Sequence, residues 1–216
     1  MQIKKEQVET LLNTKFLKVY DLQYDKDKHY YDATRRDFDT LTAIKSDEEF
    51  SNLEADAATC YVIIVTSGDE PRLLLHYEYR YPCGHYLLSV PAGLIDKEDK
   101  GKENALIITA EREIKEETGI KVSENDKVFE INHCVFSTPG LTDESNGLVG
   151  AIIYLENLSS LTNDNAEGSE AFGNFLLVTK EEALKLLKTG KDENNNFYPM
   201  YTWGALMWFA SDMWRD

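Results

Sequence analysis

The sequence predicts an α/β fold of the α+β type, in which a mixed sheet lies between helices in an α/β/α sandwich. Two observations favour this fold. Apolar runs of strand length are interspersed with stretches of helical period, and the links between the strands are of hairpin length. A chain of 216 residues is long enough for one large domain, or for a small and a larger one.

The larger part of the chain contains the elements expected to form the sandwich. Its strands are expected at Ala58–Thr66, Arg72–Arg80, Tyr86–Val90, Lys127–Ser137, Leu148–Leu155 and Phe175–Thr179. Leu158–Gly168 is rich in Asn, Asp and Ser and is expected to be a loop. A helix over Lys180–Lys188 should begin with Thr179 as its N-cap and Glu182 three residues on. The last helix is expected over Tyr201–Met213.

The first 54 residues are expected to form a separate strand segment, followed by the main domain over residues 55–216. The charged stretch Ser46–Glu49 marks the break between them. The expected elements before it are a helix over Lys5–Leu12, strands over Phe16–Tyr24 and His29–Arg36 joined by a turn at Asp25–Lys28, and a further strand over Asp37–Ile44. So short a segment buries little core of its own and should pack on another surface.

Composition excludes several classes of function. The formal net charge of −16 disfavours nucleic acid and anionic membranes as partners. No apolar run is long enough for a transmembrane helix, and the start lacks the apolar region of a signal peptide, so a cytoplasmic location is expected. Three widely spaced cysteines, without a Cys-x-x-Cys pair, favour reduced thiols over a zinc site or a disulfide framework.

One stretch, Arg112 to Ile120, organises the expected chemistry. It follows an apolar run of helical period, and Gly119 is placed to end the helix in the left-handed conformation. Glu113 and Glu117 are four residues apart and share one row of the helix, while Arg112 and Glu116 share the next. This arrangement fits either a solvated acidic face or a site for a hard cation such as Mg²⁺.

The order of residues in this stretch distinguishes these two interpretations. Arg112-Glu113-Ile114-x-Glu116-Glu117-x-Gly119-Ile120 resembles the second half of the Nudix box at every fixed position. The first half departs from the family pattern, because Gly93 precedes Arg112 by nineteen residues instead of fourteen. Lys97–Lys102 is the expected place of the insertion, and Asn104 stands where the family has a glutamate.

The resemblance implies a set of metal ligands. In the similar enzymes that act on ADP-ribose, the carbonyl before the first box glycine binds metal, which here is the carbonyl of Ala92. Glu113 and Glu117 would be side-chain ligands, and Glu116 would either bind metal or hold Arg112. Arg112 would fix the loop. The implied cofactor is Mg²⁺, with Mn²⁺ as the alternative ion.

A second match lies on the expected strand before the box. Tyr77-Glu78-Tyr79-Arg80-Tyr81-Pro82 resembles the Gln-Tyr-Arg-Tyr-Pro segment of the ADP-ribose branch, in which the arginine contacts the substrate. Arg80 takes that role by resemblance, with a surface ion pair as the alternative. Tyr79 or Tyr81 would stack on adenine, or would be half-buried sheet residues. The branch has a glutamate two residues before Pro91, where this chain has Ser89.

Two loops supply candidates for the general base. Ser137–Glu144, with Pro139 at its centre as a substrate contact, resembles a loop of the same branch. Glu170 precedes a strand where the branch places a catalytic glutamate, and it is the first choice for the base. Glu144 and Glu167 are the alternatives, and each could also be a solvated loop acid.

The implied function is Mg²⁺-dependent hydrolysis of ADP-ribose or a related nucleoside diphosphate sugar, giving AMP or another nucleoside monophosphate and a sugar phosphate. The alternatives are a Nudix hydrolase for another nucleotide, and a catalytically silent Nudix domain that senses a nucleotide. The resemblance also implies a homodimer that pairs through the N-terminal strand segment.

Overall fold

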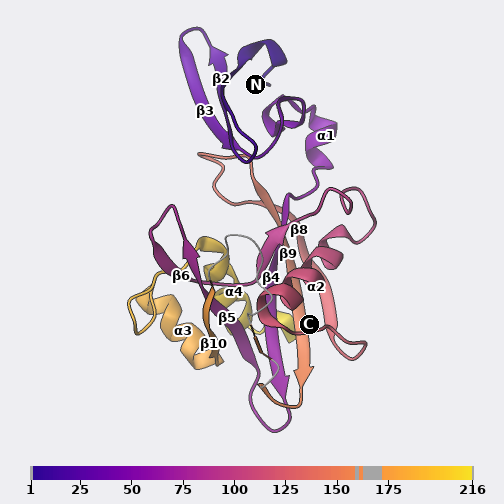
Figure 1. The fold of residues 1–216 in the computed structure, drawn as a ribbon, viewed down its shortest axis with the longest axis vertical. Helices are drawn as coiled ribbons and strands as arrows, with labels where there is room; N and C mark the ends of the chain where they lie inside the picture. The colour runs from indigo at the N-terminus through magenta and orange to yellow at the C-terminus, as the bar shows by residue number, and fades with distance from the viewer. Residues whose placement is uncertain (1, 159–160, 163–171, 216) are drawn as a thin grey trace. The chain divides into compact units, whose positions relative to one another are not determined.

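The computed structural model describes residues 2–158, 161–162 and 172–215. The chain forms two compact units (Figure 1). The first comprises Met1–Asp56 and Cys134–Asn146, and the second comprises Ala57–His133 and Gly147–Asp216. Two stretches that are far apart in the sequence therefore build the first unit.

A three-stranded antiparallel sheet in the order β1-β2-β3 forms the described part of the first unit, together with short helical turns. Its elements are η1 (Lys5–Gln7), β1 (Val8–Asn13), β2 (Lys18–Asp25), β3 (Lys28–Thr34), η2 (Phe38–Thr40), η3 (Thr42–Ile44) and α1 (Asp47–Ser51). The predicted strands and the turn near Asp25 are confirmed. The turn places Asp27 at φ 55°, in the left-handed region that Asp tolerates better than most residues.

Two predictions in this segment are wrong. The helix expected over Lys5–Leu12 is a single 3₁₀ turn followed by β1, because β2 offers that stretch a partner strand. The strand expected over Asp37–Ile44 is a pair of 3₁₀ turns. There the backbone N–H of Thr42 donates to the Asp143 carboxylate at 2.9 Å, a contact 101 positions away that no local pattern indicates.

Two carboxylates, the buried Asp32 and the partly buried Asp143, join the hairpin β2–β3 to the segment Cys134–Asn146. The backbone N–H of Asp143 donates to Asp32 Oδ1 at 3.1 Å, and the Asp143 side chain accepts from the Thr34 hydroxyl. Arg36 lies between Asp143 Oδ2 at 3.4 Å and Asp56 Oδ2 at 2.6 Å. Burial, and next the charge of Asp143, raise the pKa of Asp32 from 3.8 to about 6.

The second unit contains a seven-stranded sheet among the residues described, with β10-β5-β4-β9-β8 as its main path, β6 beside β5 and β7 beside β4 (Figure 1). Its elements are β4 (Ala57–Thr66), β5 (Arg72–Arg80), β6 (His85–Ser89), β7 (Ala92–Leu94), α2 (Ala105–Thr118), β8 (Lys127–Phe136), β9 (Ser145–Leu155), β10 (Phe172–Val178), α3 (Lys180–Thr189), α4 (Met200–Ala210) and η5 (Met213–Arg215). β8 and β9 continue into the first unit at one end.

The side chains of β4 point alternately to the two faces of the sheet and show which helices cover each face. Tyr61 and Ile63 belong to a core cluster with residues of α3 and α4. Cys60 points the other way, where its Sγ lies 3.9 Å from the carbonyl oxygen of Ala110 on α2. Because successive side chains of a strand point to opposite faces, α2 covers one face of the sheet and α3 and α4 cover the other. This confirms the predicted α/β/α sandwich.

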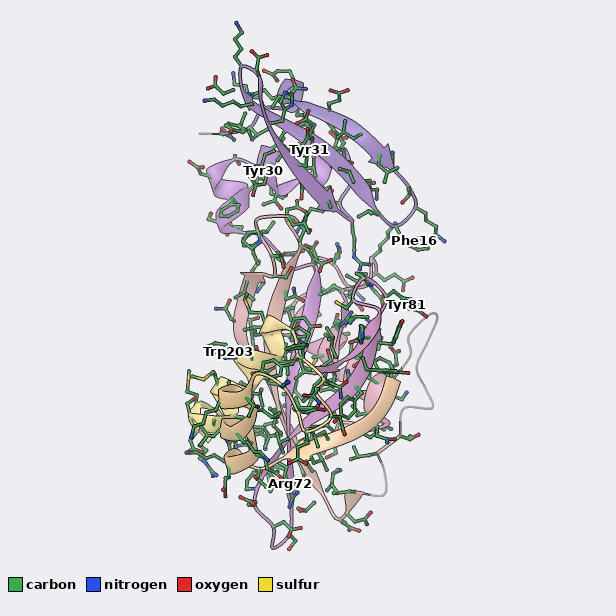
Figure 2. The ribbon with its side chains drawn as sticks, turned by 90° about the vertical axis from the view of Figure 1, so that its left-hand side faces the viewer. Phe16, Tyr30, Tyr31, Arg72, Tyr81 and Trp203 are labelled. Atoms are coloured by element: carbon green, nitrogen blue, oxygen red, sulfur yellow. The ribbon has the colours of Figure 1, made fainter. Side chains whose placement is uncertain are left out.

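The helix ends follow from local chemistry. Gly119 ends α2 at φ 75°, as predicted. Asn104 is the residue before the first turn of α2 and has φ 65°. Thr179 and Glu182 form the predicted capping box of α3. Of the tryptophans of α4, Trp208 is buried, whereas Trp203 lies on the outer side of the helix (Figure 2). None of the described helices is both long and apolar enough to span a bilayer.

We predict that ionisation of Asp32 destabilises the protein. Its pKa when folded, about 6, exceeds the ordinary value of 3.8, so the stability that its proton provides is complete below pH 3.8 and is lost as the pH rises through 6. Asp32→Asn keeps an acceptor for the Asp143 N–H but cannot ionise. The melting temperature of the variant, relative to wild type, should therefore be higher near pH 7.5 than near pH 4.

The matched control is Glu48→Gln, which removes an exposed carboxylate of the same unit. Its difference from wild type should not vary across this pH range. An Asp32→Asn difference that is equally independent of pH would contradict the prediction.

Candidate active site

The buried face of α2 contains two carboxylates. Glu113 and Glu117 are only 6% and 3% exposed, so the interpretation of a solvated acidic face is wrong for both. They lie on the same face of the helix as the buried residues Ala110 and Ile114. Glu116 is partly exposed. Burying like charges in this way is costly unless cations or donors face them.

Gly93 lies directly against the Glu113 carboxylate. It belongs to β7, which pairs with the start of β4 so that Ala92 faces Thr59. A Cβ at position 93 would lie 1.8 Å from Glu113 Oε1, a distance that no side chain could occupy. The missing side chain of Gly93 therefore provides the space for the Glu113 carboxylate. Ala92, the predicted carbonyl ligand, is the neighbouring residue on β7.

Arg112 links α2 to the segment that follows β7. Its Nη1 lies 2.7 Å from Glu113 Oε1 and 2.9 Å from Glu116 Oε2. Its Nη2 donates to the carbonyl oxygen of Leu94 at 2.9 Å, and its Nε lies 3.3 Å from Asp96 Oδ2. One guanidinium thus contacts two of the four glutamates of α2 and the backbone of the loop.

His76 faces the other glutamate. Its Nδ1 lies 3.6 Å from Glu117 Oε2, and the imidazole is 1% exposed. Burial, and next the positive charge of Arg80, lower the pKa of His76 to about 3, so the ring is neutral at physiological pH. Cys60, on β4, lies on the same side of the sheet as these glutamates. Burial, and next the charges of Glu117 and Glu113, raise the pKa of its thiol.

Arg80 belongs to a polar cluster at the end of β5. Its Nη2 lies 2.6 Å from Glu78 Oε2 and donates to the Tyr201 hydroxyl at 2.7 Å. The Tyr201 hydroxyl also lies 3.4 Å from Ser89 Oγ, and Ser89 pairs across strands with His76. The predicted substrate arginine and the helix glutamates are thus joined by a series of adjacent polar residues within one unit.

Tyr79 and Tyr81 form an aromatic group with Tyr86. The Tyr79 ring centroid lies 5.2 Å from that of Tyr81 and 5.3 Å from that of Tyr86, both in edge-on arrangements. Tyr81 is 65% exposed and extends from the end of β5 (Figure 2). Its exposed face could stack on a ring.

Pro139 and Glu144 belong to the first unit. Pro139 lines a cavity of about 420 Å³ together with Leu22, Tyr30, Tyr31, Asp32, Thr42, Ala43, Phe50, Phe136, Leu141, Thr142 and Asp143. The rings of Phe50 and Phe136 are stacked in its wall, with centroids 6.0 Å apart. Glu144 Oε2 accepts from Arg35 Nε at 3.1 Å. Glu170 and Glu167, the other candidate bases, lie outside the described residues.

The chemistry of this face suits a divalent cation. The described residues contain no cluster of three or more His, Cys, Asp or Glu side chains that would hold an ion by themselves. Magnesium, however, commonly takes only one or two carboxylates and completes its octahedron with waters and substrate phosphates. Two buried carboxylates, with space left by a glycine beside one of them, fit that requirement.

Sequence reasoning missed three residues of this site: His76, Glu78 and Tyr201. His76 could have been found from the sequence, because this polar residue directly follows the apolar run Leu73-Leu74-Leu75 of a predicted strand. No local pattern indicates the role of Tyr201, because its partner Arg80 lies 121 positions away in the sequence.

We predict that Gly93→Ala destabilises the fold by about 1–3 kcal/mol, the usual cost of overpacking a dense site. The new Cβ would displace the Glu113 carboxylate from its place beside Arg112. Adding Glu113→Ala should restore most of the loss, and chemical denaturation of both single variants and the double variant measures this coupling. Gly140→Ala is the control, because its Cβ meets only Tyr30 Oη at 3.7 Å. Additive effects of the two changes would contradict the predicted clash.

The chain is similar to several known proteins. The chain is 27% identical over 128 residues to the ADP-ribose pyrophosphatase of Bacillus subtilis (strain 168), covering 59% of this chain and 62% of that protein. It is 32% identical over 84 residues to the ADP-ribose pyrophosphatase of Mycobacterium tuberculosis (strain ATCC 25618 / H37Rv), covering 39% and 37%. The matches thus span less than two thirds of either relative.

A solved structure described as an ADP compounds hydrolase superposes with a TM-score of 0.55 at 18% identity, covering 96% of this chain and 90% of that one. At that identity the likeness concerns the fold. The model of the NUDIX domain matches residues 56–201, which is more than half of the chain. The strands, the helix and the glutamates described above therefore belong to a member of the Nudix family.

Proposed function

We propose that this protein hydrolyses the pyrophosphate bond of ADP-ribose or a related nucleoside diphosphate sugar, with Mg²⁺ as cofactor and Mn²⁺ as the alternative ion. The observation that supports this most directly is the buried pair Glu113 and Glu117 beside Gly93. The two relatives named as ADP-ribose pyrophosphatases support the choice of substrate.

In the proposed reaction, water attacks one phosphorus atom of the pyrophosphate. The bond from that phosphorus to the bridging oxygen breaks, which gives a nucleoside monophosphate and a sugar phosphate, and the proton of the water passes to a carboxylate base. A bound divalent cation would supply neutralisation of the charge that develops on the phosphoryl oxygens. Glu113 and Glu117, with the Ala92 carbonyl, would hold it. Glu116 would join them or keep Arg112 in place, as its 2.9 Å contact supports.

Substrate binding is assigned to two groups of residues. Arg80 is proposed to bind a phosphate oxygen, because its guanidinium is partly exposed and Tyr201 and Glu78 hold one of its nitrogens. Tyr79 or Tyr81 is proposed to stack on the nucleobase, which the exposure of Tyr81 supports. The cavity lined by Pro139 supports a binding role for its loop.

The experiment that tests this function measures AMP release from ADP-ribose and a panel of nucleoside diphosphate sugars with Mg²⁺. Wild type should release AMP, and Glu117→Gln should lose most turnover while it remains folded. Glu170→Gln should lower kcat by about 10²–10⁴, the usual cost of removing a general base, with little change in magnesium affinity. Glu144→Gln should lower it less.

If Glu144→Gln is the impaired variant instead, the base belongs to the Pro139 loop. If wild type cleaves no nucleoside diphosphate derivative, the hydrolase proposal fails and a nucleotide-sensing role replaces it. Full activity of Glu117→Gln at ordinary magnesium would remove Glu117 from the ligands.

A homodimer that pairs through the N-terminal strand segment is part of the proposal. The first unit presents large apolar side chains to solvent on a sheet of three strands, which is too small to bury them itself. Phe16 is 70% exposed at the turn between β1 and β2, and Tyr30 and Tyr31 are about half exposed on β3 (Figure 2).

Light scattering at low micromolar concentration should give twice the chain mass of 24.7 kDa. Phe16→Ser should shift this equilibrium toward monomer, because it removes the most exposed ring of the segment. Leu184→Ser on α3 changes an exposed apolar residue of the other unit and should leave the mass unchanged. A fully active monomeric wild type would refute the dimer.

A further inference from the structure

His76 is a buried polar side chain whose place the reaction above does not explain. It lies on β5, is 1% exposed, and follows three buried leucines. Its cross-strand partner on β6 is Ser89. With Leu74 it points to the face of the sheet that α2 covers, because alternate residues of a strand share a face.

The surroundings of the ring are mostly apolar. The Phe172 ring packs against it, with centroids 4.8 Å apart and planes inclined by 53°. Neither ring nitrogen makes a hydrogen bond to any described residue. Most buried side-chain polar atoms in proteins do have such a partner, so the exception requires an explanation.

The carboxylate of Glu117 lies near enough to supply such a partner. His76 Nδ1 and Glu117 Oε2 are 3.6 Å apart, just beyond the range of a hydrogen bond. Both groups are almost completely buried, His76 on the sheet and Glu117 on the helix packed over it. A small rotation of the carboxylate would close this distance, whereas the imidazole is held by Phe172 and the strand.

From this geometry we infer that His76 is a positioning residue for Glu117: its Nδ1–H donates to Glu117 Oε2 and so turns the other carboxylate oxygen toward the divalent cation. This rests on the proposed function, because it requires that Glu117 bind the cation. A neutral imidazole has one donor nitrogen and one acceptor nitrogen, so the contact fixes the tautomer with hydrogen on Nδ1. Partners that orient metal-binding carboxylates in this way strengthen metal affinity.

The test is a calorimetric titration of the full chain with Mn²⁺ alone, in the absence of any nucleotide. His76→Leu removes the donor and keeps an apolar side chain in an apolar environment, so it should weaken Mn²⁺ binding about 10–100-fold with no loss of melting temperature. His76→Gln keeps an N–H donor and should recover most of the affinity. Leu74→Met, a conservative change at a buried residue on the same face, should bind Mn²⁺ as wild type does.

A second comparison keeps the inference testable if His76→Leu folds poorly. His76→Ala also removes the donor and should weaken Mn²⁺ binding in the wild-type background, whereas Glu117→Gln and Glu117→Gln/His76→Ala should bind Mn²⁺ equally weakly, because His76 acts only through Glu117. Unchanged Mn²⁺ affinity in His76→Leu, or a His76→Gln variant as weak as His76→Leu, would overturn the inference and leave the proposed function intact. Absence of Mn²⁺ binding by wild type would overturn both.

Discussion

Two carboxylates on the buried face of one helix are the constraint on which the second unit depends. Glu113 and Glu117 repel one another, and each loses hydration on burial. One guanidinium, that of Arg112, faces both Glu113 and Glu116. A fold that evolved for stability alone would place leucines here. The retained acids make this face suited to a divalent cation, and the glycine of β7 leaves the space that one of them needs.

The strand partners in the sheet change along β4. The first residues of β4 pair with β7, whereas its last residues pair with β5, which pairs further along with β6. The chain crosses from one pair to the other through Val90 and Pro91, whose carbonyl accepts from the Cys60 N–H at 2.7 Å. The strands at this change of partners contain His76, Ser89 and Arg80. The glutamates belong to α2, which packs on these strands. A ligand placed there can be held by backbone and side chains of several elements at once.

Local sequence patterns predicted what local physics determines. The end of α2 at Gly119, the capping box of Thr179 and the bounds of β5 follow from propensity and period, and the structure has them. The failures have a tertiary cause. The backbone N–H of Thr42 donates to the carboxylate of Asp143, and this distant acid holds the 3₁₀ turns around it. The order of the glutamates in the sequence indicated a cation site. It did not indicate that His76 lies against one of them, because strand register and helix packing determine that contact.

Glu78 and Ser89, the serine that stands where the branch has a glutamate, both act on the surroundings of the same arginine. Glu78 binds Arg80 at 2.6 Å, and Ser89 contacts the tyrosine that accepts from Arg80. A phosphate that binds this guanidinium, as proposed above, would share its positive charge with a carboxylate already in place, which reduces the net contribution of the new ion pair to binding. Tyr201 can keep its hydrogen bond throughout, because its hydroxyl is neutral and burial raises its pKa. At the proposed phosphate site of Arg80, the neighbouring glutamate would therefore favour ligands with a larger negative charge, such as a pyrophosphate.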